Sequence, residues 1–256
     1  MLRTHKKRIF AFLTASLLLL TCVPTARGLS NGAACIDEAS ISQLLEGTVF
    51  FGESTTAHLS RRGGVLDTSA WRSHVWRDES GTRILDRRLP SGEVILYTQN
   101  GTPVSRSVAD ALACERPARI VLSFGLNGLS AHEKDPDRFL STYRFFLDRI
   151  KELSPDTRIY LQSIYPIREN TVFSTDADVL NRHICDLNER LFSACLAWGD
   201  ATYLDTASVL RGERGALAPA FDAGDGIHLT NDAYLAILSF LSEHLGALHN
   251  TERNQL

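Results

Sequence analysis

Three side chains have the types and order that nucleophilic catalysis requires. Ser54 follows a short apolar run near the start of the chain, and Asp225 and His228 form an Asp-x-x-His pair near its end. A serine hydroxyl is a weak nucleophile unless an adjacent base takes its proton. His228 is the type of residue that acts as this base, and Asp225 can hold the imidazole tautomer and stabilise the imidazolium. The pattern therefore indicates covalent catalysis by a serine.

Attack by a serine on an acyl group creates an oxyanion, which needs hydrogen-bond donors. The side-chain amide of Asn127 follows another apolar run, and the Ser54 backbone N–H is expected at the start of a helix. Losing one such donor typically adds ~3 kcal/mol to the barrier. These two groups are therefore candidates for an oxyanion hole.

Apolar runs and helical patterns alternate along the chain after residue 36. Short runs without polar alternation are typical of strands buried on both faces of a parallel sheet. The predicted strands cover residues 48–51, 94–97, 120–124, 158–161 and 201–204. The predicted helices cover residues 37–46, 106–114, 136–153, 177–198 and 232–245. The pattern predicts an α/β domain with helices on both faces of the sheet, and residues 71–92 are expected to form an irregular or hairpin insertion between the first two strands.

The candidate residues fall where a parallel sheet binds ligands. In open sheets of this class, ligands lie beyond the carboxyl ends of the strands. Ser54 follows the first predicted strand and Asn127 the third, while Asp225 and His228 precede the last helix. We therefore expect all four to meet at one edge of the sheet.

Together these segments resemble the motifs of the SGNH/GDSL hydrolase family of esterases and lipases. Gly52-Glu53-Ser54 matches the family's Gly-Asp-Ser, with Glu in place of Asp. Residues 125–128 match its Gly-x-Asn-Asp, with Gly128 in place of the last Asp, and residues 225–228 match its Asp-x-x-His. Each motif alone is weak evidence, but three in family order are fairly specific.

The resemblance implies a function for each matched residue. It implies Ser54 as nucleophile, Asp225 and His228 as the other triad members, and Asn127 as an oxyanion donor. The family also has a glycine after the second strand whose N–H serves the oxyanion, and Gly101 is the candidate here, although Asn100-Gly101 is equally a plain turn signal. The implied fold is a three-layer α/β/α sandwich with a flavodoxin-like parallel sheet of about five strands. The implied reaction is ester hydrolysis through an acyl-serine, with no metal or organic cofactor.

Residues 1–28 resemble a secretory signal peptide. Basic residues precede an apolar run from Ile9 to Leu20, and small residues follow it. The run is shorter than the roughly 20 residues that span a bilayer, so cleavage is favoured over an uncleaved anchor. We therefore expect a hydrolase domain over residues 29–256, outside the cytoplasm or secreted, without stable membrane insertion after cleavage.

Composition and location narrow the substrate and the alternatives. A net charge of -3 with dispersed basic residues argues against a nucleic-acid partner. The expected substrate is an ester, with O-acetyl groups of extracellular carbohydrate as the leading choice. Two other functions stay open, an O-acyltransferase of the cell envelope and a catalytically silent glycan-binding module.

Four cysteines remain after cleavage, and Cys185 and Cys195 are expected on one helix, too far apart to form a disulfide with each other.

Overall fold

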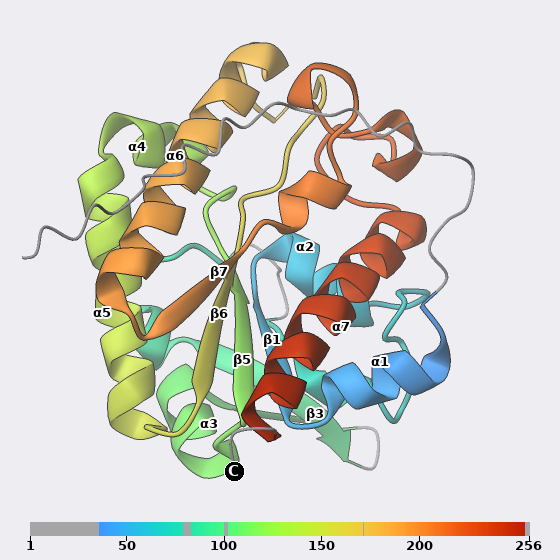
Figure 1. The fold of residues 1–256 in the computed structure, drawn as a ribbon, viewed down its shortest axis with the longest axis vertical. Coiled ribbons are helices and arrows are strands. Elements are labelled where there is room, and N and C mark those ends of the chain that lie inside the picture. Colours follow the sequence, from blue (N-terminus) through green and yellow to red (C-terminus); the bar gives the residue numbers. More distant parts are fainter. Residues whose placement is uncertain (1–35, 79–82, 100–101, 171, 254–256) are drawn as a thin grey trace, which may run out of the picture. The chain divides into compact units, whose positions relative to one another are not determined.

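A five-stranded parallel sheet forms the centre of the domain. The computed structural model describes residues 36–78, 83–99, 102–170 and 172–253. The strands of this sheet are β1 (Thr48–Gly52), β2 (Val75–Trp76), β5 (Arg119–Ser123), β6 (Arg158–Gln162) and β7 (Ala201–Leu204). Their spatial order is β2-β1-β5-β6-β7, and every neighbouring pair is parallel (Figure 1). This is the flavodoxin-like order, so the predicted fold class is confirmed.

Helices cover both faces of the sheet. The α-helices are α1 (Glu38–Leu45), α2 (Ser54–Ala57), α3 (Val108–Glu115), α4 (Leu129–Lys134), α5 (Pro136–Leu153), α6 (Ala177–Trp198) and α7 (Asn231–Arg253). Helices α1 and α7 pack on one face, and α3, α5 and α6 pack on the other (Figure 1). The three layers follow from strands that have two apolar faces to bury.

Successive strand residues supply the two halves of the core. Phe50 and Val121 pack in the cluster with α1 and α7, whereas their neighbours Phe51 and Leu122 pack in the cluster with α3, α5 and α6. All four are 0% exposed. Side chains alternate between the faces of a strand, so an unbroken apolar run fills both layers. Each such burial stabilises the fold by roughly 2 kcal/mol.

Capping residues fix the ends of helices α5 and α6, whose bounds the sequence predicted correctly. Asp135 accepts a hydrogen bond from the Arg138 N–H at the start of α5, and Pro136 occupies the first turn. Asp176 accepts from two amides at the start of α6, which ends at Gly199 with φ 73°. Such caps satisfy amides that have no partner within the helix, and glycine adopts positive φ without strain. Helices 136–153 and 177–198 are confirmed.

The second strand differs from the prediction. Residues 94–97 lie in a separate antiparallel hairpin of β3 (Glu93–Gln99) and β4 (Thr102–Ser107). The second strand of the central sheet is Val75–Trp76, within the segment predicted to be an irregular insertion. The strand Val75–Trp76 is too short to produce a periodic pattern in the sequence. The apolar run at residues 94–97 resembles a core strand because Val94 and Leu96 are buried, although it lies in the hairpin. The helix predicted from residue 106 begins at Val108, because β4 continues through Ser107.

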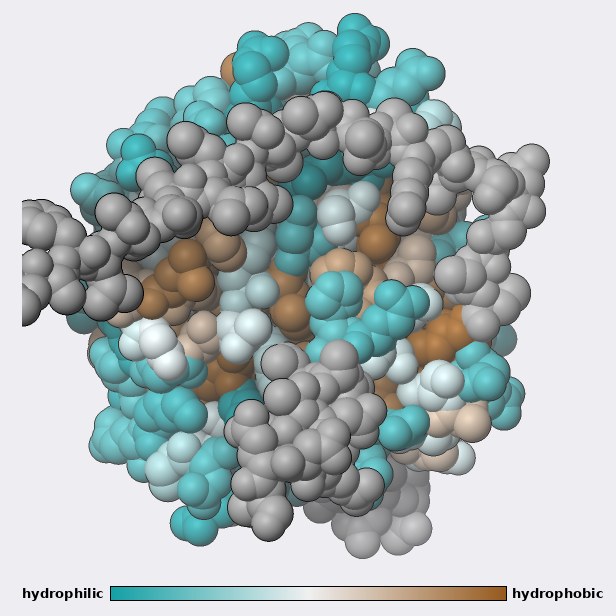
Figure 2. Space-filling model, viewed as in Figure 1, coloured by the Kyte–Doolittle hydropathy of each residue, from teal (hydrophilic) through white to brown (hydrophobic). Residues whose placement is uncertain are grey.

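The surface, the hydropathy of the helices and the cysteines complete the description of the domain. On the face in Figure 2, hydrophobic residues appear as separate patches among hydrophilic ones. Within the described ranges, no helix is long and apolar enough to cross a membrane. Cys185 and Cys195 both lie on α6 as free thiols, as does Cys114 on α3. The predicted signal peptide and Cys35 lie outside the described residues.

Candidate active site

The turn from β1 into α2 presents Ser54 at the carboxyl end of the sheet. Ser54 is the first residue of α2, directly beyond β1. The turn is tight, since a Cβ at Gly52 would lie 2.4 Å from the Ser123 carbonyl oxygen and 2.4 Å from Thr56 Oγ1. Only glycine allows this close approach of backbone and side chains. The Gly-Glu-Ser motif is therefore a strand-to-helix turn that exposes a hydroxyl.

His228 joins Ser54 to Asp225 across the sheet edge. Its Nε2 lies 3.1 Å from Ser54 Oγ, and its Nδ1 lies 2.5 Å from Asp225 Oδ2. Both distances are within hydrogen-bond range. The sequence-predicted serine, histidine and aspartate are thus brought into one hydrogen-bonded chain, from segments 174 positions apart.

The charge of Asp225 determines where the imidazole proton lies. Partial burial opposes its ionisation, but hydrogen bonds from the His228 ring and from the backbone N–H groups of His228 and Ile227 lower the pKa of Asp225 to about 2. An ionised carboxylate only accepts hydrogen bonds, so Nδ1 must carry the proton. In the neutral imidazole, Nε2 then carries no hydrogen and faces the Ser54 hydroxyl, as a general base does.

The loop that carries Asp225 and His228 is fixed by its own backbone. Asp222 Oδ1 accepts hydrogen bonds from the N–H groups of Gly224 and Gly226, each at 2.9 Å. The Ala223 N–H donates to the His228 carbonyl oxygen at 2.9 Å. Asp222 therefore closes this loop, and the carboxylate that contacts the His228 ring is that of Asp225.

Asn127 is held on three sides. Its backbone N–H donates to Glu53 Oε2 at 2.9 Å, its carbonyl oxygen lies 3.1 Å from His132 Nε2, and its Nδ2 donates to the Arg83 carbonyl oxygen at 3.0 Å. An amide nitrogen carries two hydrogens, so one remains for another acceptor. The role of Asn127 as an oxyanion donor stays a prediction.

Glu53, the residue before the serine, is buried beside the Asn127 loop. It is 2% exposed, and its carboxylate accepts N–H hydrogen bonds from Gly125, Leu126 and Asn127 at 2.8, 3.1 and 2.9 Å. Burial raises the pKa of Glu53 to about 8, and the three N–H groups oppose that rise. Because all three donors point at the two carboxyl oxygens, the ionised form is the one that fits these contacts. The sequence showed Glu53 only as a departure from the family motif and gave no sign of these contacts.

His58 lies against the candidate base. It begins the 3₁₀ turn after α2. Burial is the largest cause that lowers the pKa of His58 to about 4, and the charges of Arg61 and His228 lower it further. In the sequence, His58 stands four residues after Ser54. Its ring contact with His228 could not be foreseen, because it depends on the position of a loop 170 residues away.

Gly101 falls outside the described residues, so its predicted role stays untested. The strand expected to deliver it belongs to the hairpin rather than to the central sheet. The first glycine after the observed second strand is Gly81, which also lies outside the described residues.

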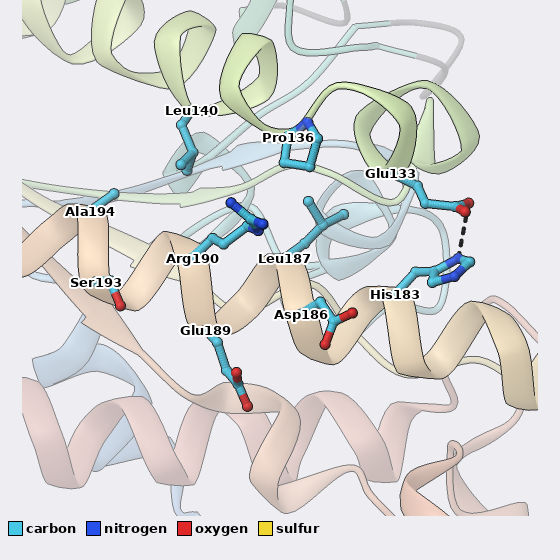
Figure 3. Close-up of a pocket in the computed structure, with 10 residues that line it drawn as sticks. All are labelled: Glu133, Pro136, Leu140, His183, Asp186, Leu187, Glu189, Arg190, Ser193 and Ala194. Atoms are coloured by element: carbon cyan, nitrogen blue, oxygen red, sulfur yellow. Dashed lines mark ion pairs between the residues drawn. The ribbon is translucent and has the colours of Figure 1, made fainter.

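A pocket of about 820 Å³ lies away from these residues, between α5 and α6 (Figure 3). An ion pair between Glu133 and His183 at 2.9 Å closes one end of it. None of Ser54, Asp225 and His228 lines this pocket.

Among the described residues, no group of three or more His, Cys, Asp or Glu side chains is arranged to hold a metal ion.

Comparison with known proteins connects this geometry to a family. The sequence model of the GDSL-like lipase/acylhydrolase family matches residues 50–236. No curated protein sequence matches the chain. A GDSL-like lipase from Bacteroides thetaiotaomicron has a similar fold, with a TM-score of 0.53 and 16% identity, over 80% of this chain and 90% of that one. A peptidoglycan O-acetylesterase is similar at a TM-score of 0.50 and 12% identity, over 83% of this chain and 95% of that one.

Proposed function

The chain belongs to the GDSL-like lipase/acylhydrolase family, a family of ester hydrolases, and from this we propose that it is an exported serine esterase that removes O-acetyl groups from extracellular glycans. The observation that carries the proposal is the contact of His228 Nε2 with Ser54 Oγ at 3.1 Å, backed by the Asp225 carboxylate. In this arrangement the Ser54 hydroxyl is the nucleophile and His228 Nε2 is its base. The Asp225 carboxylate orients that base.

In the first half of the reaction, Ser54 takes up the acyl group. The hydroxyl proton moves to His228 Nε2 as Oγ bonds to the ester carbonyl carbon, and the carbonyl oxygen becomes an oxyanion. The Ser54 N–H and the free Nδ2 hydrogen of Asn127 are the proposed donors to it. Collapse breaks the bond to the alcohol oxygen, which leaves with the proton from His228. Asp225 stabilises the imidazolium in between.

In the second half, water replaces the alcohol. His228 takes a proton from water, the resulting hydroxide attacks the acyl carbon, and the Ser54 oxygen leaves with the proton that His228 returns. The products are a carboxylic acid and the free enzyme. This chain's own residues perform each proton transfer, so no metal or organic cofactor enters the proposed steps.

The exposure of the site supports a bulky, polar substrate. The side chains of His228 and Asp225 are 30% and 54% exposed, so the reacting groups stand at the surface and can meet an acetyl group on a polymer. The apolar run at residues 9–20 and the shared fold with a peptidoglycan O-acetylesterase support export and the O-acetyl choice.

The test is acetate release by the purified protein and by Ser54→Ala. We expect the wild type to hydrolyse p-nitrophenyl acetate and O-acetylated oligosaccharides, and Ser54→Ala to lose at least ~10³-fold in kcat with its thermal unfolding unchanged. Ser42→Ala, on the exposed side of α1, is the matched control and should keep full activity. Full activity in Ser54→Ala would refute the nucleophile.

Two further outcomes separate the other functions. Transfer of the acetyl group to an added oligosaccharide in preference to water would identify an acyltransferase. Failure of the wild type to react with an active-serine probe such as a fluorophosphonate would identify a silent binding module. An acetylated-sugar panel, run beside longer acyl esters, would then define the substrate.

A further inference from the structure

Glu53 bonds to three successive amides through one buried carboxylate. Oε1 accepts from the Gly125 N–H, and Oε2 accepts from the N–H groups of Leu126 and Asn127. A carboxylate offers two oxygens with about four acceptor positions, so it can satisfy all three donors. A glutamine has one acceptor oxygen and would turn its own NH₂ toward at least one N–H. The contact is therefore specific to a carboxylate.

The backbone of the same residue fixes the nucleophile. The Glu53 N–H donates to the Ser123 carbonyl oxygen at 3.2 Å, which ties the end of β1 to the end of β5. The Glu53 carbonyl oxygen accepts from the N–H groups of Thr56 and Ala57, each at 3.0 Å, and so closes the turn that contains Ser54. One residue thus spans the Ser54 turn and the Asn127 loop.

The Asn127 loop has few other anchors near its amide groups. Gly125 has φ 131° and Gly128 has φ 87°, so the segment follows a path that only glycines adopt freely at both ends. Between them, the backbone N–H groups all point to Glu53 and none bonds to a neighbouring strand. The position of the Asn127 backbone relative to Ser54 therefore depends on the Glu53 side chain, while Arg83 holds the Asn127 side-chain amide and His132 contacts its carbonyl oxygen.

We infer that Glu53 is a positioning residue that sets the Asn127 amide against the oxyanion formed at Ser54. The inference rests on the proposed function, because it assigns a role within that reaction. Donors act on the transition state only when they are aimed at the developing charge, and a misplacement of ~1 Å can cost ~10²-fold in rate. The effect of Glu53 passes through Asn127 and involves no contact with the substrate.

The test is a double-mutant cycle of Glu53→Gln and Asn127→Ala, with p-nitrophenyl acetate as substrate. We expect Glu53→Gln alone to lower kcat by ~10- to 100-fold and to leave KM within about twofold. In the Asn127→Ala background the same substitution should lower kcat by less than about threefold, because the group it positions is gone. An equal loss in both backgrounds, or wild-type kcat in Glu53→Gln, would overturn the inference.

Two further variants make the result independent of folding. Glu133→Gln removes a carboxylate from nearby α4, outside the catalytic machinery, and should leave kcat unchanged. Glu53→Asp keeps the charge on a side chain one methylene shorter and should restore part of the kcat lost in Glu53→Gln. If Glu53→Gln does not fold, Glu53→Asp enters the cycle in its place, and a loss of kcat that is equal with and without the Asn127 side chain would overturn the inference.

The proposed function is judged separately. A wild type inactive on every ester tested would refute the function, whereas an active wild type with an additive cycle would refute only the role of Glu53. The cycle also distinguishes positioning from general stability, because a purely structural loss would lower kcat equally with or without Asn127.

Discussion

The imidazole ring of His58 lies against the ring of His228, with centroids 4.5 Å apart and planes inclined by 37°. His58 Nδ1 is buried without a hydrogen-bond partner among the described residues. Charging His58 would bring a cation beside His228, which becomes an imidazolium in the proposed reaction. The charges near it are those of Arg61 and His228, which disfavour its protonation, and Asp225, which favours it. The neutral ring is therefore the form compatible with catalysis.

Replacing His58 by phenylalanine should change how stability depends on pH. The ordinary pKa of 6.5 falls to about 4 in the folded protein, so the unfolded chain binds this proton first as the pH drops. The free energy of unfolding of the wild type should therefore fall between about pH 6.5 and pH 4, and that of His58→Phe should fall less. Urea unfolding at four pH values in this window measures the two slopes. Parallel curves would contradict the assignment.

Asn127→Ala should reduce turnover rather than binding. If Nδ2 donates mainly to the oxyanion, its loss should lower kcat by ~10²- to 10³-fold and change KM little. Steady-state kinetics on p-nitrophenyl acetate separates the two constants. A change confined to KM would show that Asn127 contacts the ground-state ester.

Asp225→Asn should lower kcat by ~10²- to 10⁴-fold. The amide can no longer serve as an anionic acceptor for His228 Nδ1, so the proton can reside on Nε2 and block the base. Activity is measured at pH 7, where the native carboxylate is ionised because its pKa is about 2. Asp222→Asn is the companion variant, since it also alters this loop while leaving Asp225 in place. A similar loss in both would attribute the effect to loop position.

Gly226→Ala should damage the site more than Gly224→Ala. Both residues have positive φ, at 77° and 107°, so each alanine is strained. A Cβ at Gly226 would also lie 2.2 Å from the Glu169 carbonyl oxygen, whereas a Cβ at Gly224 meets nothing within 4 Å. We expect Gly226→Ala to unfold several degrees below Gly224→Ala and to lose more kcat. Equal melting temperatures would show that the loop yields without cost.

The parts of the fold that the sequence predicted well are those with local signals. Helix α5 begins at an Asp-Pro pair and α6 ends at a glycine, and both were located correctly because caps act within a few residues. The second strand was misplaced because Val75 and Trp76 form a strand only by pairing with β1. Tertiary pairing of so short a segment leaves no periodic pattern.

The candidate site divides in the same way. Ser54, Asp225 and His228 stand in short motifs, and their convergence followed from the rule that the carboxyl ends of parallel strands share one edge. The contacts of Glu53 with a loop 72 to 74 residues away had no sequence signal, because they depend on how two chain reversals meet. The same holds for the ring contact between His58 and His228.

The hydrogen bond from Asn127 Nδ2 to the Arg83 carbonyl oxygen has a practical consequence for engineering. Arg83 belongs to the connection between β2 and β3. Any graft that shifts the main chain at that point also rotates the amide that it grips. Variants built in this connection should therefore keep the Arg83 backbone in place, because the Asn127 side-chain amide is held by it.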